Sequence, residues 1–206
     1  MIRNDEEYAE VLRQLQELFA ERRREAGLRR VSGGSASRDK EGGISISAAA
    51  DNRERKRDRN IGRGIRKRNT KAEGEMAELA YMYMAGKNGI RSAKPYGDSL
   101  PFDQIAITPE IYDLYKVQVR CTAHHKNLIY AVSLMKAGGT THYQPHEFDY
   151  LAALLVPEDA WYIIPFAELP ATNEVYLHPR LQPGQAGGRC DKFRSRWDLL
   201  RTARRS

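Results

Sequence analysis

One aspartate, and the end of an apolar segment fifteen residues later, form the part of this sequence best suited to chemistry. Asp103 follows Pro101-Phe102 and precedes the apolar run Ile105-Ala106-Ile107. A second apolar run begins at Leu114 and ends in Gln118-Val119-Arg120, which supplies a polar acceptor and a cation. A carboxylate at one strand end, beside an acceptor and a cation on the next strand, is what metal-dependent hydrolysis of a phosphodiester requires.

The residue types also fit the metal that such chemistry uses. Mg²⁺ prefers hard oxygen ligands, and the sequence offers the Asp103 carboxylate, the Gln118 amide oxygen and the main-chain carbonyl of Val119. Side chains two apart on a strand share a face, so Arg120 is expected to point to the same place as Gln118. The expected site therefore combines a cation-binding set with a fixed positive charge.

A helix before these strands is expected to complete the site. Residues 73–85 have helical periodicity, and Gly86 and Gly89 are expected to end the helix. Glu78 or Glu75 on this helix is expected to supply the second carboxylate, because residues three apart lie on neighbouring positions of one helix face. The apolar side chains expected to share a face are Met76, Leu79, Ala80, Tyr83 and Met84.

Short strands separated by turn signals follow this helix. They are expected at residues 90–94, 103–108, 115–122, 128–134, 148–156 and 161–166. The second and third form a hairpin, the first is an edge strand, and a short helix begins at Phe166. The order of helix, strands and helix predicts an α/β fold with a mixed central sheet flanked by helices.

The N-terminal segment is expected to be an amphipathic helix over residues 5–26. Asn4 can cap its start, acidic residues fill its first turn, and Gly27 can end it. Its apolar stripe consists of Tyr8, Val11, Leu12, Leu15, Leu18 and Phe19. This helix is expected to pack on the main domain or to pair with a second copy of itself.

Positive charge is concentrated in one segment of the chain. The net charge is +7, whereas residues 53–71 alone hold ten basic residues against two acids, a net of +8. A globular body with a basic arm is typical of a polyanion binder, although a solvated charge run is the alternative. The basic residues expected to contact nucleic acid are Arg53, Arg55, Lys56, Arg57, Arg59, Arg63, Arg66, Lys67 and Arg68.

The composition excludes several classes of protein. With 41% apolar residues among 206, a core is expected, and no apolar run is long enough for a transmembrane helix. The polar N-terminus lacks a secretory apolar segment, and Cys121 and Cys190 make neither a disulfide framework nor a zinc set. These features favour a reduced cytoplasmic setting, on the nucleoid if the source is prokaryotic, with no membrane partner.

Four regions are expected on these grounds. They are an N-terminal amphipathic helix at residues 1–27, a Gly-, Ser- and Arg-rich arm or linker at 28–70, a catalytic domain at 71–180 and a basic tail at 181–206.

Residues 70–169 resemble the PD-(D/E)xK nuclease superfamily. They are most similar to the branch that includes group I intron-associated endonucleases and archaeal Holliday-junction resolvases. The residues that carry the resemblance are Gly74-Glu75-Met76-Ala77-Glu78, Pro95-Tyr96-Gly97-Asp98, Phe102-Asp103, Val117-Gln118-Val119-Arg120, Glu147-Phe148-Asp149-Tyr150 and the later Trp161 to Pro165. The resemblance implies a restriction-endonuclease-like core in which Glu78 takes the helix carboxylate position.

Two residues depart from the common pattern of that superfamily. Gln118 replaces the commoner glutamate, as is typical of the intron-nuclease branch. Arg120 stands where lysine is usual, and arginine keeps the positive charge but has a planar fork that is not deprotonated in proteins. Lys116 on the same face, or Lys126 from the next strand, is a candidate substitute for the missing ammonium.

The leading hypothesis is a Mg²⁺-dependent endonuclease acting on double-stranded DNA, with Mn²⁺ as a substitute metal and a homing-type enzyme as the candidate kind. Asp103, Gln118, Val119 and Glu78 are expected to hold the metal, and Arg120 to stabilise charge on phosphorus. Cutting both strands calls for two active sites, so a homodimer or homotetramer is expected. The alternatives are a DNA-binding protein that keeps the nuclease fold with weak or no catalysis, and a basic RNA-binding accessory protein.

Overall fold

The computed structural model describes residues 2, 4–31, 71–97, 99–109, 112–136, 141–181 and 187–202. The chain divides into two compact units, one of residues 1–16 with 74–206 and the other of residues 17–73. The first unit contains the sheets and the candidate site. The basic residues between Arg53 and Arg68, predicted to contact nucleic acid, lie outside the described residues.

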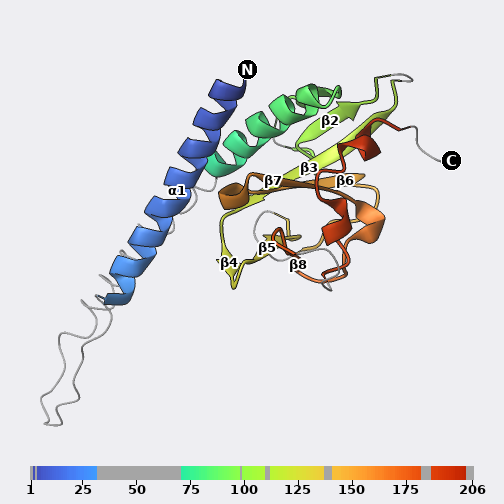
Figure 1. The fold of residues 1–206 in the computed structure, drawn as a ribbon. Coiled ribbons are helices and arrows are strands. Elements are labelled where there is room, and N and C mark those ends of the chain that lie inside the picture. The colour runs from blue at the N-terminus through green and yellow to red at the C-terminus, as the bar shows by residue number, and fades with distance from the viewer. Residues whose placement is uncertain are drawn as a thin grey trace, which may run out of the picture. The chain divides into compact units, whose positions relative to one another are not determined.

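A mixed five-stranded sheet forms the centre of the first unit (Figure 1). Its strands, in spatial order, are β1 (Arg91–Ala93), β2 (Gln104–Ile107), β3 (Leu114–Thr122), β6 (Tyr150–Leu155) and β7 (Ala160–Pro165). The β3–β6 pair is parallel and the other three pairs are antiparallel. The predicted α/β class with a mixed sheet is therefore confirmed, with β1 at an edge as expected.

The sequence of two of these strands explains their burial. β6 and β7 read as nearly continuous apolar runs, Tyr150-Leu151-Ala152-Ala153-Leu154-Leu155 and Ala160-Trp161-Tyr162-Ile163-Ile164-Pro165, and nearly every residue is buried. Such runs are typical of strands covered on both faces, because each face then buries apolar area.

A second, three-stranded sheet was not predicted. It consists of β4 (His125–Lys126), β5 (Ile129–Ser133) and β8 (Glu174–Leu177), in that order and all antiparallel. The expected strand at residues 128–134 is therefore present as β5 but belongs to this sheet. Tyr130 and Leu177, which pair across β5 and β8, are both buried in one apolar cluster with residues of β6 and β7.

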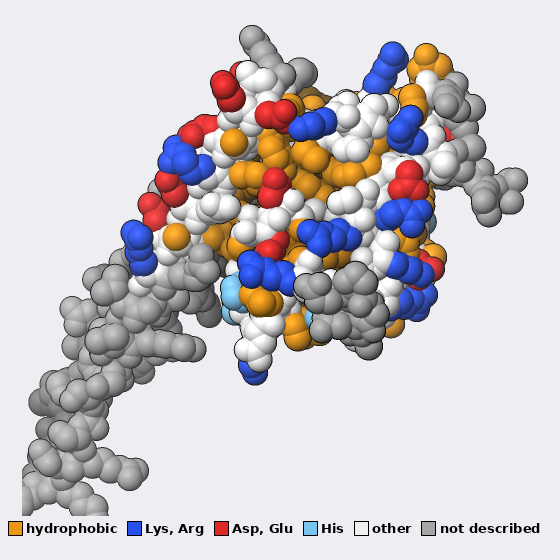
Figure 2. All heavy atoms as spheres, in the orientation of Figure 1, with side chains coloured by type: hydrophobic (Ala, Val, Ile, Leu, Met, Phe, Trp, Pro, Cys, Tyr) orange, Lys and Arg blue, Asp and Glu red, His pale blue; other side chains and the backbone are white. Residues whose placement is uncertain are grey.

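The helix before β1 spans residues 71–87, and its buried face differs from the expected one. Ala77, Ala80 and Tyr81 are at most 1% exposed, whereas Leu79 is 41% exposed. The prediction that Leu79 belongs to the packed face was wrong, because the small alanines allow the helix to approach the body closely. Figure 2 shows hydrophobic side chains gathered over this helix.

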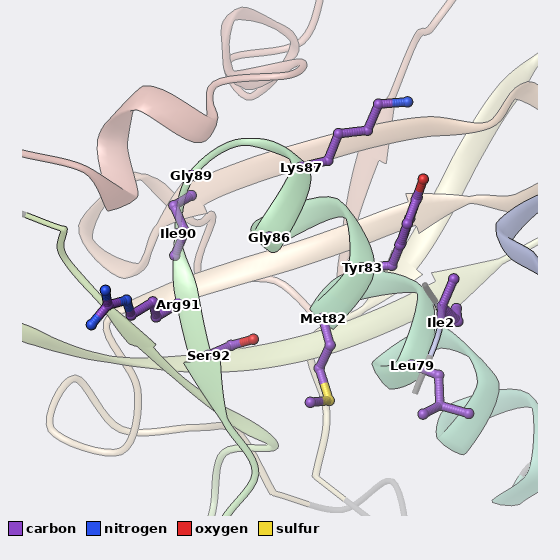
Figure 3. Close-up of a pocket in the computed structure, with 10 residues that line it drawn as sticks. All are labelled: Ile2, Leu79, Met82, Tyr83, Gly86, Lys87, Gly89, Ile90, Arg91 and Ser92. Atoms are coloured by element: carbon purple, nitrogen blue, oxygen red, sulfur yellow. The ribbon is translucent and has the colours of Figure 1, made fainter. Parts of the chain in front are cut away.

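The outer face of this helix borders a shallow hollow of about 730 Å³ (Figure 3). Leu79, Met82 and Tyr83 line it from the helix, and Ile90 and Arg91 line it from the following turn and β1. Gly89 has a φ of +75°, a conformation that glycine adopts without strain. The turn at Gly89 ends the helix as expected and leads the chain directly into the edge strand, whereas Gly86 lies within the last turn of the helix.

Helix α1 (Asp5–Val31) begins as predicted, and its first turns pack within the first unit. The Asn4 side chain accepts the backbone N–H of Glu7 at 2.8 Å, which caps the helix. Tyr8 and Leu15 are buried, at 6% and 0% exposure. The helix continues through Gly27 to Val31, so its predicted end at Gly27 was wrong.

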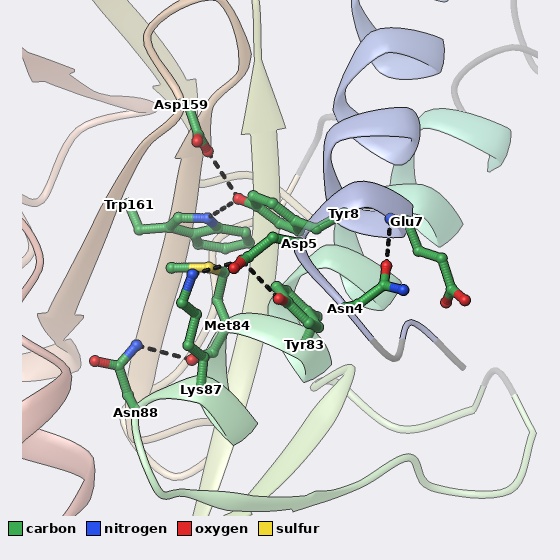
Figure 4. A network of polar contacts seen from close by, with 10 residues as sticks. All are labelled: Asn4, Asp5, Glu7, Tyr8, Tyr83, Met84, Lys87, Asn88, Asp159 and Trp161. Atoms are coloured by element: carbon green, nitrogen blue, oxygen red, sulfur yellow. Dashed lines mark hydrogen bonds and ion pairs between the residues drawn. The ribbon is translucent and has the colours of Figure 1, made fainter.

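A polar network attaches the start of α1 to the sheet (Figure 4). The buried Tyr8 hydroxyl donates to Asp159 Oδ1 at 2.7 Å and accepts from Trp161 Nε1 at 3.0 Å. Burial raises the pKa of Tyr8, and the Asp159 carboxylate raises it further, so the hydroxyl stays protonated. Asp5 accepts from Tyr83 at 2.7 Å and pairs with Lys87 at 2.5 Å, which connects α1 to the second helix.

The C-terminal residues that the structure describes contribute to the core. They form two short 3₁₀ turns, Asp191–Phe193 and Trp197–Leu200. Trp197 is 4% exposed and lies 5.7 and 5.8 Å from the ring centroids of Trp161 and Tyr81. Among the described residues, no helix is long and apolar enough to span a membrane.

Candidate active site

Asp103 is fixed against β3 by hydrogen bonds to residues far along the chain. It directly precedes β2, and its backbone N–H donates to the Val117 carbonyl at 3.0 Å. Its Oδ2 atom accepts the Val119 N–H at 2.8 Å and the Gln118 Nε2 group at 2.5 Å. The hairpin register thus brings together the aspartate and the strand motif that lie fifteen residues apart in the sequence.

Gln118 is a buried side chain, 3% exposed, on the central part of β3. Its Nε2 group donates to Asp103 Oδ2 and, at 3.4 Å, to the Val119 carbonyl. Both partners are acceptors, which assigns the NH₂ end of the amide to this side. If the Gln118 amide oxygen bound a cation, Gln118 would lose its hydrogen bond to Asp103. Both residues would then be ligands of the same cation.

Glu78 reaches the same region from the helix of residues 71–87. Burial raises the pKa of its carboxyl, and the nearby charges of Asp103 and Glu75 raise it further, while Lys94 lowers it. Glu78 Oε2 lies 2.7 Å from Lys94 Nζ, with the glutamate side chain 17% exposed and the lysine 50%. A carboxyl whose pKa is raised by a neighbouring carboxylate is in the electrostatic environment that a divalent cation relieves.

The Asp103 carboxyl itself is subject to opposing effects. Burial raises its pKa, whereas the Val119 N–H, the cations of Arg120 and Lys94, and the Gln118 amide lower it. Burial is the largest of these, so the net pKa lies above the usual range of an aspartate. A perturbed group among charged partners is characteristic of functional sites.

Arg120 lies on the same face of β3 as Gln118, but its guanidinium is held by a neighbouring loop. One Nη atom donates to the Tyr143 hydroxyl at 2.6 Å and to the Met135 carbonyl at 3.3 Å. The guanidinium carbon lies 5.7 Å from the centre of the Tyr143 ring. Its charge still lowers the pKa of Asp103, so the cation remains within electrostatic reach of that carboxylate.

Two residues that the sequence did not single out take part in this arrangement. Lys94 follows β1, whose register pairs Ala93 with Ile105, and its charge lowers the pKa of Asp103. Tyr143 lies in a loop, and its hydroxyl accepts a hydrogen bond from Arg120. No pattern in the sequence predicts this contact.

The two lysines expected as substitute cations are engaged or placed elsewhere. Lys116 donates to the His146 carbonyl. Lys126 is exposed on β4, which belongs to the second sheet. Neither lysine therefore takes the position that the motif reserves for an ammonium.

The donor set fits a hard divalent cation. Two carboxylates, an amide and a main-chain carbonyl are the oxygen ligands that Mg²⁺ accepts. Among the described residues there is no cluster of three or more His, Cys, Asp or Glu side chains suited to a metal. A cation here would therefore depend on Asp103 and Glu78 together with the neutral oxygens of Gln118 and Val119.

This sheet, with a helix carboxylate beside a strand-end aspartate, is the arrangement of nucleases with a restriction-endonuclease-like core. The chain belongs to the PD-(D/E)XK endonuclease family, whose family model matches residues 68–198. It is also similar to the solved structure of a bacterial homing endonuclease, I-Ssp6803I, with a TM-score of 0.52 and 26% sequence identity. That match covers 64% of this chain and 91% of the other. A search of curated proteins gives no match.

Proposed function

We propose that this protein is a metal-dependent endonuclease of the homing type that hydrolyses phosphodiester bonds in double-stranded DNA. The observation that carries the proposal is the hydrogen-bonded pair of Asp103 and Gln118, with the Glu78 carboxylate in the same electrostatic environment. The family and the similarity to a bacterial homing endonuclease support the same conclusion.

Asp103, Gln118, the Val119 carbonyl and Glu78 are the proposed ligands of Mg²⁺, for which Mn²⁺ is a substitute. When bound, the metal would neutralise charge on the phosphate and lower the pKa of a water molecule. The chain prepares this site through backbone geometry, since the Val119 N–H holds the Asp103 carboxylate in place. Arg120, fixed by Tyr143, adds positive charge that favours an approaching phosphate.

The proposed substrate follows from charge as well as from family. Residues 53–71 carry a net charge of +8, which attracts a nucleic-acid backbone irrespective of its sequence. Cleavage of both strands of a duplex requires two active sites, so we propose a homodimer or homotetramer. Light scattering after size-exclusion chromatography, with and without duplex DNA, measures this directly.

Nicking of supercoiled plasmid tests the activity. The purified protein is expected to convert the plasmid to nicked and linear forms in Mg²⁺ or Mn²⁺, and EDTA should stop the reaction. Asp103→Ala should be inactive, since it loses both a ligand and the anchor of Gln118. Asp198→Ala, which removes an exposed partner of Arg196, is a matched control that should cleave normally. Equal cleavage by Asp103→Ala and the wild type would rule out this site.

One observation favours a second candidate function, a DNA-binding protein with weak or no catalysis. The lysine position of the motif holds Arg120, and its guanidinium is already bound by Tyr143 and Met135. Arg120→Lys separates the two functions. A change from no cleavage to cleavage would indicate a binding protein with a degenerate site, whereas cleavage by the wild type supports the enzyme.

A further inference from the structure

Lys94 is a cation at the edge of the candidate site to which the motif assigns no role. It directly follows β1, which pairs with β2, the strand that Asp103 precedes. Its Nζ atom lies 2.7 Å from Glu78 Oε2, and its side chain is half exposed. We propose that Lys94 supplies the catalytic ammonium of this nuclease, in place of the lysine that Arg120 replaces on β3.

The first support for this assignment is the engagement of Arg120. Its guanidinium is held by the Tyr143 hydroxyl, the Met135 carbonyl and the face of the Tyr143 ring. These contacts fix a planar group that stays charged at any working pH. Arg120 is therefore suited to attract and orient the phosphate. Because its guanidinium is held in place, it is poorly suited to move with the phosphoryl oxygens as they change position during the reaction.

The second support is the position of Lys94 among the proposed ligands. Glu78 is its ion-pair partner, and the Lys94 charge also lowers the pKa of Asp103, so the ammonium acts on both carboxylates. Lysine presents a compact charge with three rotatable donors on a flexible stem. A lysine with a half-exposed side chain in this place can meet a phosphate oxygen arriving from solvent while it stays beside Glu78.

The chemistry that this assignment implies is balanced without any oxidant or reductant. A water oxygen forms a bond to phosphorus as the bond from phosphorus to the leaving sugar oxygen breaks. One water proton passes to solvent, and the leaving oxygen takes a proton from solvent. Lys94 keeps its own proton throughout and donates hydrogen bonds to the phosphoryl oxygens, where negative charge increases in the transition state.

The proposal rests on the proposed nuclease function, and Lys94→Met tests it because methionine keeps much of the apolar stem and removes the charge. Single-turnover cleavage of plasmid in Mg²⁺ is expected to slow by about 10²-fold, the effect of removing one transition-state donor. Duplex affinity measured by fluorescence anisotropy in Ca²⁺ should change by less than about 3-fold, because one phosphate contact contributes little among many. The melting temperature should stay near that of the wild type, since the Lys94 side chain is half exposed.

A matched control and a rescue variant sharpen the test. Lys87→Met removes the ion pair with Asp5 at the C-terminal end of the helix that carries Glu78, and it should leave the cleavage rate unchanged. Lys94→Met combined with Arg120→Lys returns an ammonium to the motif position and should recover at least about 10-fold of the missing rate.

Each outcome decides one question. Cleavage by Lys94→Met within about 2-fold of the wild-type rate overturns the assignment while leaving the nuclease function standing. If Lys94→Met slows cleavage but also lowers the melting temperature, or weakens DNA binding by as large a factor as it slows cleavage, the role of Lys94 is structural. That result also overturns the assignment. A wild type that does not cleave, or that cleaves as well with Asp103→Ala, overturns the proposed function and this assignment with it.

Discussion

At the scale of single residues, the hydrogen bonds that Asp103 makes in the folded protein also position it as a proposed metal ligand. Its carboxylate accepts the backbone N–H of Val119, so the carboxylate is in place before any cation arrives. Preorganisation of this kind lowers the cost of binding because few groups must move.

Metal-induced stabilisation of the intact protein provides the matching prediction. Mg²⁺ at about 100 times its dissociation constant stabilises a folded protein by about 2.7 kcal/mol, so the wild-type melting temperature should rise by several degrees. Asp103→Asn should abolish this rise, because the ligand charge is removed, and Asp198→Asn should keep it. Differential scanning fluorimetry with and without Mg²⁺ gives the readout, and an undiminished rise in Asp103→Asn would remove Asp103 from the ligand set.

The sequence was sufficient for some of these residues and not for others. The contact between Asp103 and Gln118 could be predicted because the hairpin that joins them is local, with a short turn between strands. The position of Lys94 depends on the register of an edge strand of three residues, which no periodicity reveals. Arg120 was predicted as a phosphate cation, but its partner Tyr143 is contributed by a loop 23 residues further on.

At the scale of elements, hydrophobicity identified the helix before β1 but not its orientation. Leu79 is the kind of side chain that a hydrophobic pattern assigns to the core, yet Ala77 and Ala80 occupy the buried face. Small residues bury less area each, but they allow a helix to pack more closely against its neighbours. That preference depends on the shape of the packed surface, which a one-dimensional pattern does not contain.

Glu158 connects the two sheets through a hydrogen bond. It ends the 3₁₀ turn Val156–Glu158 between β6 and β7, and its Oε1 accepts from the buried Tyr130 hydroxyl of β5 at 2.9 Å. Arg180 Nε lies 3.0 Å from its Oε2. The Arg180 hydrogen bond, followed by that of Tyr130, lowers the pKa of Glu158, so the folded state favours the carboxylate.

The lowered pKa fixes the sign of a pH-dependent prediction. A carboxyl whose pKa is depressed by folding stabilises the protein fully above its unfolded pKa of about 4.3, and the contribution disappears as the pH falls through the folded pKa. Glu158→Gln should therefore reduce the free energy of unfolding by about 1–2 kcal/mol at pH 7. The destabilisation should shrink below about pH 4.

Urea denaturation across a pH series tests this contact. Glu174→Gln is the matched control, because the Glu174 carboxylate on β8 accepts a hydrogen bond from the exposed Tyr176 hydroxyl, and the destabilisation should be small at every pH. A destabilisation by Glu158→Gln that stays constant down to about pH 3 would show that the charge of Glu158 does not contribute.

At the scale of the whole molecule, the second sheet is the part of the fold that could not be predicted from the sequence. β8 has four residues and pairs with β5, whose register joins Tyr130 to Leu177 across a long stretch of chain. Such pairings are selected by the core that the two sheets share and not by local preference. The family match to residues 68–198 includes this second sheet and the start of the 3₁₀ turn at Trp197.

The whole-molecule charge pattern leads to the last prediction. Replacing the nine basic residues from Arg53 to Arg68 with glutamine changes the net charge of residues 53–71 from +8 to −1. If the arm neutralises phosphates, the slope of log affinity against log salt concentration should fall by about 0.9 for each phosphate that the variant no longer neutralises, and affinity should fall equally for all DNA sequences. The cleavage rate at saturating DNA should hold, because Asp103, Gln118 and Glu78 are unchanged.

Replacement of the same arginines by lysine keeps the charge and should keep the slope. Fluorescence anisotropy over a salt series gives both quantities. An unchanged slope in the glutamine variant would show that the positive charge of this segment serves solubility and that the DNA backbone is bound elsewhere on the protein.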